Sequence, residues 1–549
     1  MMRKRLFTLF VIILSISLVS GCMQKPSSGE EEASATDDSG VTKITTVRTL
    51  KDDTKFKDGQ DVNDNVVTDW AKDELNIDFD TLWTVPSDEQ YNTKIRLAMS
   101  AGKDLPDVFL VSDNQLISDL IESGRVMQID EAIDQYASPR LKEIFQKFPK
   151  AFYPGTVDGK RYGLPRFSGG NGSDSLLWVR QDWLDKFNLK APKTMEELEH
   201  VMDVFTNQDP DGNGKDDTIG LTLASKNGLA TWLADGSFIF GAEGDYEPKY
   251  WSENEEGKLV YGSIQPNAKK ALSKLHDWYT KGYLDKEVGI LDEQAAIESF
   301  IAGKSGIISA PPWADGWPIA DAEKNNKGAD VQPYPLPSGE NGQIGRRGEG
   351  LTTGQFLFSK DFKHMDKFFE YWDAIYGYTL GDSKFFEKGM FEDYDYVMKD
   401  GQPVYDQKVI ENVTGEEVID PGKYFLTTDV PTVPYMLYDL LEQFHETGRE
   451  PENPYEYRLA GKSEEYIEAG AIVNQQNDIR IENDFNGPPT KTLKEKGELL
   501  EKMEQEVYAD IIYGNKPVDA FDEFVNNWKN SGGGEITKEV NEWYESVQQ

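Results

Sequence analysis

Apolar and polar residues along the first fifth of the chain follow two alternating periods. Segments 43–49, 77–85 and 105–111 are rich in β-branched, aromatic and aliphatic residues and predict strands. Between them, segments 66–75 and 89–101 carry apolar residues three or four positions apart and predict helices. Strands and helices that alternate in this way predict a doubly wound, largely parallel sheet of the α/β class.

The same kind of pattern starts again in the middle of the chain. Segment 176–180 predicts a strand, and Thr194 and Glu197 have the spacing of a capping box in front of a helix with a buried apolar stripe. Segment 266–281 predicts a further helix and 305–310 a further strand. Because 549 residues exceed the size at which a single core stops growing, we expect two lobes.

The N-terminus has the features of an export signal. Three basic residues, Arg3, Lys4 and Arg5, precede an apolar run at 6–19 that is too short for a confident membrane span. An uncleaved anchor helix is the alternative. Residues after Cys22 and up to about Gly40 are rich in Ser, Glu and Asp without apolar periodicity, which predicts a disordered tether. Since Cys22 is the single cysteine, no disulfide can form within the chain.

Charge and motif content exclude several classes of function. The formal net charge of −40 repels phosphate backbones, which excludes nucleic acid as a partner. A serine nucleophile elbow, an H-E-x-x-H metal motif, a P-loop and a dinucleotide fingerprint are all missing from the sequence. Among 98 acidic residues a pair suited to a glycosidase can always be found, so such pairs carry no information. We therefore predict a binding protein and not an enzyme.

The stretch D-P-D-G-N-G-K-D-D-T-I-G at 209–220 resembles half of a calcium-binding EF-hand. Gly214 stands where that loop turns sharply, and Gly220 replaces the closing Glu. Because the loop occurs once, we expect a structural Ca²⁺ and not a sensor. A metal-free Asp/Asn/Gly surface turn is the alternative. The expected ligands are Asp209, Asp211, Asn213, the Lys215 carbonyl and Asp217, with Thr218 as an uncertain sixth.

Several segments together resemble a known family. L-V-S-G-C at 18–22 resembles a bacterial lipobox, which implies cleavage before Cys22 and diacylation of its sulfur. The stretches S-A-G-K-D-L-P-D-V-F, V-D-G-K-R-Y-G-L-P, L-W-V-R-Q-D-W-L-D-K-F and F-I-A-G-K-S-G-I-I-S occur in the order and spacing of family 1 extracellular solute-binding proteins of bacterial ABC importers. The resemblance is to the large oligosaccharide-binding lipoproteins, among them the calcium-containing alginate-binding type. In that family an acid often follows the ninth loop position, where this chain has Thr218.

The resemblance implies a periplasmic-binding-protein-like fold whose two α/β lobes close on a hinge. It implies an oligosaccharide captured between the lobes by a monomer lipid-anchored at the extracellular face of the cell membrane, and delivered to an ABC permease. A peptide cargo on the same fold is the alternative, and a further role in signalling is compatible. The expected segments are a signal peptide (1–21), a tether (22–42), the N-lobe (43–165), the C-lobe with the calcium loop (166–304), a return to the N-lobe (305–360) and a mainly C-lobe helical part (361–549).

A sugar ring has an apolar face and an edge of hydroxyls, so its site needs aromatic walls and polar edge readers. Trp313 and Trp317, in a Pro/Gly-rich loop after a predicted strand, are the first candidates for walls; packing at the hinge is the alternative. The remaining candidates are Tyr162, Arg166, Phe167 and Asn171 near the expected crossing between lobes, Trp232, the adjacent Arg346 and Arg347, and Arg48 and Asp113 near the ends of N-lobe strands. For Phe167 and Trp232 core packing is the alternative, and for the arginine pair surface solvation.

Overall fold

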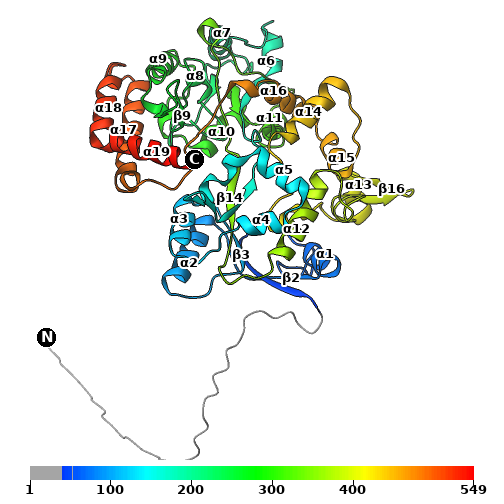
Figure 1. Ribbon diagram of the computed structural model, residues 1–549. Helices are drawn as coiled ribbons and strands as arrows, with labels where there is room; N and C mark the ends of the chain where they lie inside the picture. Colours follow the sequence, from blue (N-terminus) through cyan, green and yellow to red (C-terminus); the bar gives the residue numbers. More distant parts are fainter. Residues whose placement is uncertain (1–39, 52–53, 549) are drawn as a thin grey trace, which may run out of the picture.

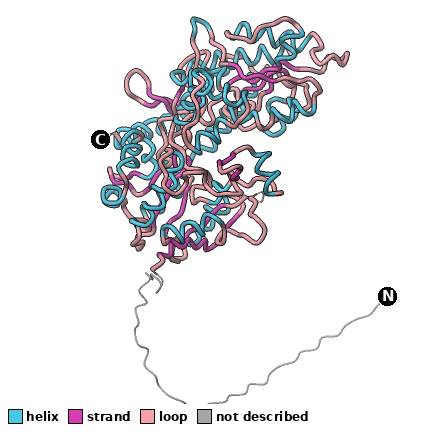
Figure 2. The backbone as a smooth tube through the Cα atoms, turned by 90° about the vertical axis from the view of Figure 1, so that its right-hand side faces the viewer, coloured by secondary structure: helices cyan, strands magenta, loops and turns pink. Residues whose placement is uncertain are grey.

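The computed structural model describes residues 40–51 and 54–548, which form two lobes, one below the other in Figure 1. Strands gather at two separate levels, as Figure 2 shows. The predicted signal peptide, Cys22 and most of the predicted tether lie outside the described residues. Among the residues that are described, no helix combines the length and apolar character needed to cross a membrane.

The N-lobe contains two strand groups that one side chain connects. Strand β1 (Thr42–Thr49) runs parallel to β2 (Ile77–Val85), and β14 (Thr352–Phe358) lies antiparallel between β3 (Val108–Val111) and β6 (Gly163–Phe167). The Asp107 carboxylate, just before β3, accepts the Thr45 amide N–H of β1 at 2.8 Å. The helices of this lobe are α1 (Val66–Leu75), α2 (Asp88–Ser100), α3 (Asn114–Glu122), α4 (Asp130–Tyr136), α5 (Pro139–Lys147), α12 (Met365–Thr379) and α13 (Gln407–Thr414).

The C-lobe is built on a four-stranded sheet in the order β12-β7-β11-β8, formed by Val331–Tyr334, Leu176–Arg180, Ser305–Ala310 and Ile219–Thr222. Every residue of β7 and β11 is buried, because helices cover both faces of the sheet. These helices and their neighbours are α6 (Gln181–Lys186), α7 (Met195–Asn207), α8 (Phe238–Gly241), α9 (Pro266–Thr280), α10 (Glu293–Ile301), α11 (Ile319–Asn325), α14 (Met436–Thr447), α15 (Pro454–Ala460), α16 (Glu464–Gln475), α17 (Lys491–Ile512), α18 (Ala520–Trp528) and α19 (Gly534–Val547).

Short strand pairs complete the molecule. They are β4 (Thr156–Val157) with β5 (Lys160–Arg161), β9 (Trp251–Glu253) with β10 (Leu259–Tyr261), β13 (Arg346–Arg347) with β17 (Arg480–Ile481), and β15 (Val397–Lys399) with β16 (Gln402–Val404). The last pair forms a hairpin at the side of the molecule (Figure 1). The β13–β17 pair is parallel and attaches a late part of the chain next to the lobe junction.

Strand direction and lobe boundaries differ from the sequence expectation. The sheets are mixed and not largely parallel. Strand β7 is antiparallel to its neighbours β11 and β12, and β14 is antiparallel to its neighbours β3 and β6. Segment 305–360 does not return to the N-lobe as a whole, because β11 and β12 belong to the C-lobe sheet and the chain re-enters the N-lobe only at β14. Helix α12 also belongs to the N-lobe, where the ring of Tyr371 lies 4.8 Å from that of Phe79.

Helix starts follow local capping chemistry. At α1, Asn65 accepts the N–H of Thr68 while the Thr68 hydroxyl accepts the N–H of Asn65, which is a full capping box. At α7, Thr194 accepts the N–H of Glu197 as predicted, but the Glu197 carboxylate accepts the N–H of Lys193 instead of the N-cap N–H. These caps satisfy backbone donors that the first helical turn leaves free.

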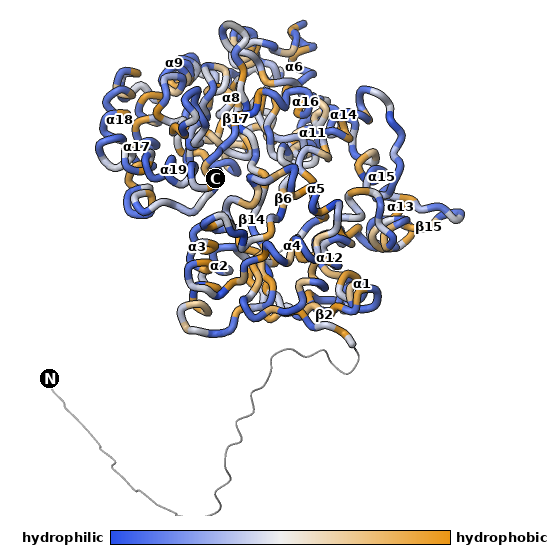
Figure 3. The backbone as a smooth tube through the Cα atoms, viewed as in Figure 1, coloured by the Kyte–Doolittle hydropathy of each residue, from blue (hydrophilic) through white to orange (hydrophobic). Residues whose placement is uncertain are grey.

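The core follows the two faces of the C-lobe sheet and continues into the N-lobe. Leu176 and Trp178 of β7 face one cluster, while Leu177 and Val179 face another that includes α7, α9 and α17. Helices α17 and α19 also carry both hydrophobic and hydrophilic residues along their length, as Figure 3 shows. The first cluster also contains Phe356 of β14, so one apolar core extends through the junction of both lobes.

Candidate functional site

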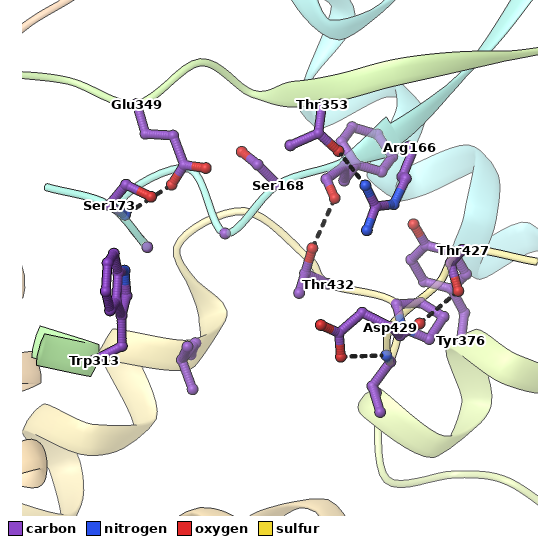
Figure 4. Close-up of a pocket in the computed structure, with 16 residues that line it drawn as sticks. Arg166, Ser168, Ser173, Trp313, Glu349, Thr353, Tyr376, Thr427, Asp429 and Thr432 are labelled. Carbon is purple, nitrogen blue, oxygen red and sulfur yellow. Dashed lines mark hydrogen bonds between the residues drawn. The ribbon is translucent and has the colours of Figure 1, made fainter. Parts of the chain in front are cut away.

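The chain crosses between the lobes three times, at 168–175, 335–351 and 431–435. A pocket with a volume of about 230 Å³ lies beside these crossings. Figure 4 shows that it is lined from both lobes: Arg166 and Tyr376 belong to the N-lobe, Trp313 to the C-lobe, and Glu349 to the second crossing. A molecule in this pocket would therefore contact both lobes and the hinge at once.

Hydrogen bonds hold the polar residues of the pocket in place. Arg166 donates through Nη1 to the Thr353 hydroxyl at 3.0 Å, and the Thr432 hydroxyl donates to the Phe167 carbonyl at 2.9 Å. The Asp429 carboxylate accepts the backbone N–H of Val430 at 2.9 Å. These partners fix donors and acceptors around the cavity before any ligand arrives, which lowers the entropy cost of binding.

Glu349 is the acid of the second crossing that lines the pocket. Its Oε2 accepts the N–H of Ser173 from the first crossing at 2.9 Å. Burial, together with the nearby negative charge of Asp174, raises the pKa of Glu349 to about 7. Near neutral pH this carboxyl group is present in both protonation states, so it can accept a hydroxyl hydrogen or donate its own.

A buried ionic cluster holds the crossings together directly behind the pocket. Asp174 is fully buried and lies 3.0 Å from Nη2 of Arg346 and 2.6 Å from Nε of Arg480. Arg480 also donates to the Glu349 carbonyl at 2.9 Å and to the Tyr435 hydroxyl at 2.8 Å. One arginine from late in the chain thereby connects all three crossings.

The structure places the two predicted wall tryptophans differently. Trp313 lies in the short turn Pro312–Asp315 directly after β11, is partly buried and lines the pocket. The turn is anchored by the Ser463 hydroxyl, which donates to the Asp315 carboxylate at 2.5 Å. Trp317 is 39% exposed and does not line the pocket.

Residues predicted near the first crossing have mixed placements. Phe167 is buried against Phe145, with ring centroids 6.3 Å apart, and reaches the pocket at its edge. Tyr162 packs against the N-lobe core near Phe109, away from the pocket. Asn171 is fully buried, and neither its side-chain oxygen nor its nitrogen has a partner within the described part of the chain.

Trp232 and Arg347 lie next to each other in the C-lobe, outside the pocket lining. Arg347 donates to the carbonyl of Thr231, and its guanidinium is 4.0 Å from the buried carboxylate of Asp235. Trp232 is 53% exposed, and the N–H of the following Leu233 is held by Glu293 at 2.9 Å. Arg347 is thus neutralised locally and does not act as a free surface cation.

The structure does not bring Arg48 and Asp113 to the pocket, and both have structural partners. Arg48 is buried and donates to three successive backbone carbonyls, at Lys423, Tyr424 and Phe425. Asp113 caps α3 by accepting the N–H of Leu116 at 2.8 Å. Position near a strand end therefore did not identify ligand-facing side chains here.

Several lining residues escaped the sequence reasoning. They come from α12, from the third crossing and the residues just before it, and from the start of α14, far along the chain from the others: Tyr376, Thr427, Asp429, Val430, Pro431, Thr432 and Leu437. Tyr376 lies in a helix that is buried almost throughout, so its periodicity resembles that of core residues. The T-T-D-V-P-T-V-P stretch at 427–434 was the available signal, because polar residues beside prolines are typical of exposed loops.

The predicted calcium loop closes on itself through backbone contacts. Asp209 accepts the N–H groups of Asn213 and Gly214 at 3.0 Å each, and Asn213 Nδ2 donates to Asp211 at 2.6 Å and to Asp217 at 3.0 Å. Within 40–51 and 54–548, no three acidic, histidine or cysteine side chains are arranged as a metal site.

Thr218 faces away from the loop. Its side chain is buried, and its hydroxyl donates to the Phe205 carbonyl at 2.8 Å. This hydrogen bond connects the end of the loop to the last turn of α7, and the prediction of Thr218 as a metal ligand is wrong for this geometry.

Comparison with known sequences finds relatives that span most of the chain. The polygalacturonan/rhamnogalacturonan-binding protein YtcQ of Bacillus subtilis is 26% identical over 490 residues, which cover 86% of each protein. Lipoprotein LipO of the same organism is 22% identical over 475 residues, 84% of this chain and 85% of LipO. The fructooligosaccharide ABC transporter substrate-binding protein FusA of Streptococcus pneumoniae is 27% identical over 355 residues, 61% of this chain and 63% of FusA.

Solved structures and the family comparison agree on the fold. An extracellular solute-binding protein from Bifidobacterium longum subsp. infantis superposes with a TM-score of 0.69 at 16% identity, over 94% of this chain and 100% of that one. The alginate-binding protein AlgQ2 superposes with a TM-score of 0.60 at 18% identity, over 94% and 100%. Residues 53–372, more than half of the chain, match the family of bacterial extracellular solute-binding proteins. The chain belongs to that family, whose members bind solutes outside the cell.

Proposed function

We propose that this protein is the substrate-binding component of an ABC importer and captures an oligosaccharide between its two lobes. The observation that carries the proposal is the pocket at the hinge, where Trp313 of one lobe and Arg166 of the other line a single cavity. An aromatic wall with hydroxyl-reading side chains at its edges is the arrangement that a sugar ring requires. The relatives named for binding polygalacturonan or rhamnogalacturonan and for fructooligosaccharides support this cargo class.

The mechanism is binding without chemistry. The sugar's apolar face packs on Trp313, while its hydroxyls reach Arg166, Asp429 and Glu349. Contacts to both lobes are complete only when the lobes are closed, so the ligand shifts the population toward the closed state by its differential affinity. The closed monomer then docks on the permease subunits in the membrane.

We place the protein at the extracellular face of the cell membrane, anchored through lipid on Cys22. The lipobox-like sequence before Cys22 and the similarity to lipoprotein LipO support this location. Metabolic labelling with a radioactive fatty acid tests it: the native chain should take up label and Cys22→Ser should not. Label on the serine variant would place the lipid elsewhere.

We propose further that the 209–217 loop binds one structural Ca²⁺. Asn213 donates hydrogen bonds there to the carboxylates of Asp209, Asp211 and Asp217, and oxygen ligands of this kind suit a hard cation. Burial and the adjacent carboxylates of Asp217 and Asp209 raise the pKa of Asp211, which indicates crowded negative charge. Asp209, Asp211, Asn213, Lys215 and Asp217 would hold the ion, which would supply cross-linking of the loop and no reaction chemistry.

The first experiment is a thermal-shift screen of the purified protein against oligosaccharides and short peptides. A rise in melting temperature with oligosaccharides alone supports the proposal. A rise with peptides alone replaces the cargo with peptide. No shift with either class, checked by calorimetry, would overturn the assignment of the pocket.

A further inference from the structure

The charged groups around the pocket bear on whether it holds neutral sugars or uronic acids. An inference about this choice rests on the proposed function. Of the described residues that line it, three carry formal charge: Arg166, Glu349 and Asp429. Two acids and one base line the cavity, and Lys423, just outside the lining, already pairs with Asp429 at 2.9 Å. Each of the three side chains comes from a different part of the hinge region, so the imbalance is spread around the cavity and not confined to one edge (Figure 4).

Cations just outside the lining are already neutralised. Arg346 and Arg480 share the buried carboxylate of Asp174, at 3.0 and 2.6 Å, and Arg480 pairs in addition with Glu482 at 2.6 Å. Arg347 is held by the Thr231 carbonyl and faces Asp235. To bind an anionic ligand, these arginines would have to break buried ion pairs. The free energy lost in breaking such a pair exceeds the free energy gained from the new one.

Arg166 itself is poorly placed to recruit an anion. Burial lowers the pKa of Arg166, and the negative charge of Asp429 opposes that shift. The guanidinium already donates to Thr353 at 3.0 Å. A carboxylate that approached Arg166 would also meet the field of Asp429, Glu349 and a chain of net charge −40.

A hydroxyl group fits the same surroundings without conflict. It donates to the carboxylates of Asp429 or Glu349 and accepts from the guanidinium of Arg166, so one neutral sugar edge satisfies both kinds of group. A carboxylate can only accept, so it offers no hydrogen to Asp429 or to ionised Glu349 and brings a further negative charge beside them.

We infer that the sugar units held in this pocket are neutral and that uronic acids are selected against. The protein would then differ in cargo from the polygalacturonan/rhamnogalacturonan-binding relative and from the alginate-binding neighbour despite the shared fold, and resemble a binder of neutral oligosaccharides such as kestose.

Calorimetric titration of the purified protein tests the inference. Neutral tri- and tetrasaccharides, kestose and nystose among them, are compared with galacturonic-acid and alginate oligomers of equal length. We expect at least one neutral sugar to bind at least tenfold more tightly than every uronic oligomer. A uronic oligomer that binds as tightly as the best neutral sugar overturns the inference but leaves the import function standing. Binding of peptides and of no sugar overturns both.

A double variant separates the effect of the two pocket acids on sugar selectivity from the effect of the protein's net charge. Glu349→Gln with Asp429→Asn should narrow the neutral-to-uronic affinity ratio at least threefold, because it removes the two pocket acids. The control is Glu495→Gln with Glu498→Gln, two exposed positions on α17 that make the same change in net charge. An equal narrowing in both variants would show that the pocket acids do not select the sugar.

Discussion

The guanidinium of Arg480 lies 2.6 Å from the carboxylate of Asp174, and both side chains are almost completely buried. The two residues are 306 positions apart in sequence. Asp174 belongs to the first crossing between the lobes and Arg480 to β17, so their contact fixes the position of the hinge relative to a late part of the C-lobe. Arg346 shares the same carboxylate and has no other acid partner among the described residues, whereas Arg480 also pairs with Glu482 at 2.6 Å.

We predict that Asp174→Asn destabilises the protein by about 3 kcal/mol or more, since it leaves the buried Arg346 without a counter-charge and Arg480 with Glu482 alone. Urea unfolding followed by tryptophan fluorescence measures this. The control is Asp382→Asn. Asp382 pairs with Arg140, and the Asp382 side chain is 58% exposed. That variant should change stability by about 0.5 kcal/mol or less, and equal losses for both variants would contradict the role of the buried cluster.

Trp313→Ala should weaken oligosaccharide binding at least tenfold, because the ring is the aromatic wall of the pocket on the C-lobe side. Trp317→Ala, four residues on and outside the lining, should leave the affinity unchanged. Calorimetry gives both affinities, and circular dichroism checks that each variant is folded. Unchanged binding in Trp313→Ala would remove this residue from the site.

Asp211→Ala should lower the melting temperature in calcium but leave it nearly unchanged in chelator, because the loop loses an ion ligand. Asp216→Ala changes an exposed acid of the same loop that is not among the expected ligands, and should have little effect in either condition. Equal melting shifts for Asp211→Ala with and without calcium would mean that the loop holds no metal.

Glu504 makes the stability of the C-lobe depend on pH. It lies in the buried stripe of α17 and accepts the Tyr261 hydroxyl at 2.9 Å, and burial raises its pKa to about 7. A carboxyl group whose folded-state pKa is raised contributes stability that is complete below the ordinary carboxyl pKa and is lost as pH rises through about 7. The native protein should therefore lose stability between pH 5 and pH 8.

Glu504→Gln should remove this part of the pH dependence, so that the variant gains about 2 kcal/mol relative to the native chain between pH 5 and pH 8. Denaturant unfolding at the two pH values measures the difference, with Glu495→Gln on the exposed face of α17 as control. If the two variants respond identically to pH, then Glu504 is ionised throughout this range.

Local structure was predictable where the residue pattern alone determines it. The strand at 77–85 and the helix at 66–75 have the predicted bounds, and the strand at 305–310 does as well. Strand partners were not predictable. Because β11 is buried on both faces, its sequence does not say which sheet it joins, and it lies in the C-lobe instead of returning to the N-lobe.

The candidate site was predictable where its residues lie next to elements that the local sequence pattern predicts. Arg166 and Phe167 sit beside the first crossing, which the sequence places approximately, and Trp313 follows a predicted strand; all three line the pocket. Tyr376 and Asp429 reach it only through tertiary packing of α12 and the third crossing. Arg48 was predicted to contact the ligand but does not line the pocket. An arginine near a strand end can donate to backbone carbonyls as readily as to a ligand, and Arg48 does so.

One hydrophobic cluster takes side chains from both sheets, among them Trp178 and Ile308 from the upper lobe and Val108 and Phe356 from the lower. Neither half of the chain can lose its native packing without exposing part of the other's interior. We therefore expect a single cooperative melting transition in spite of the two-lobed shape. A bound sugar would then move that one transition as a whole, so that a melting curve reports occupancy of the cleft for the entire molecule.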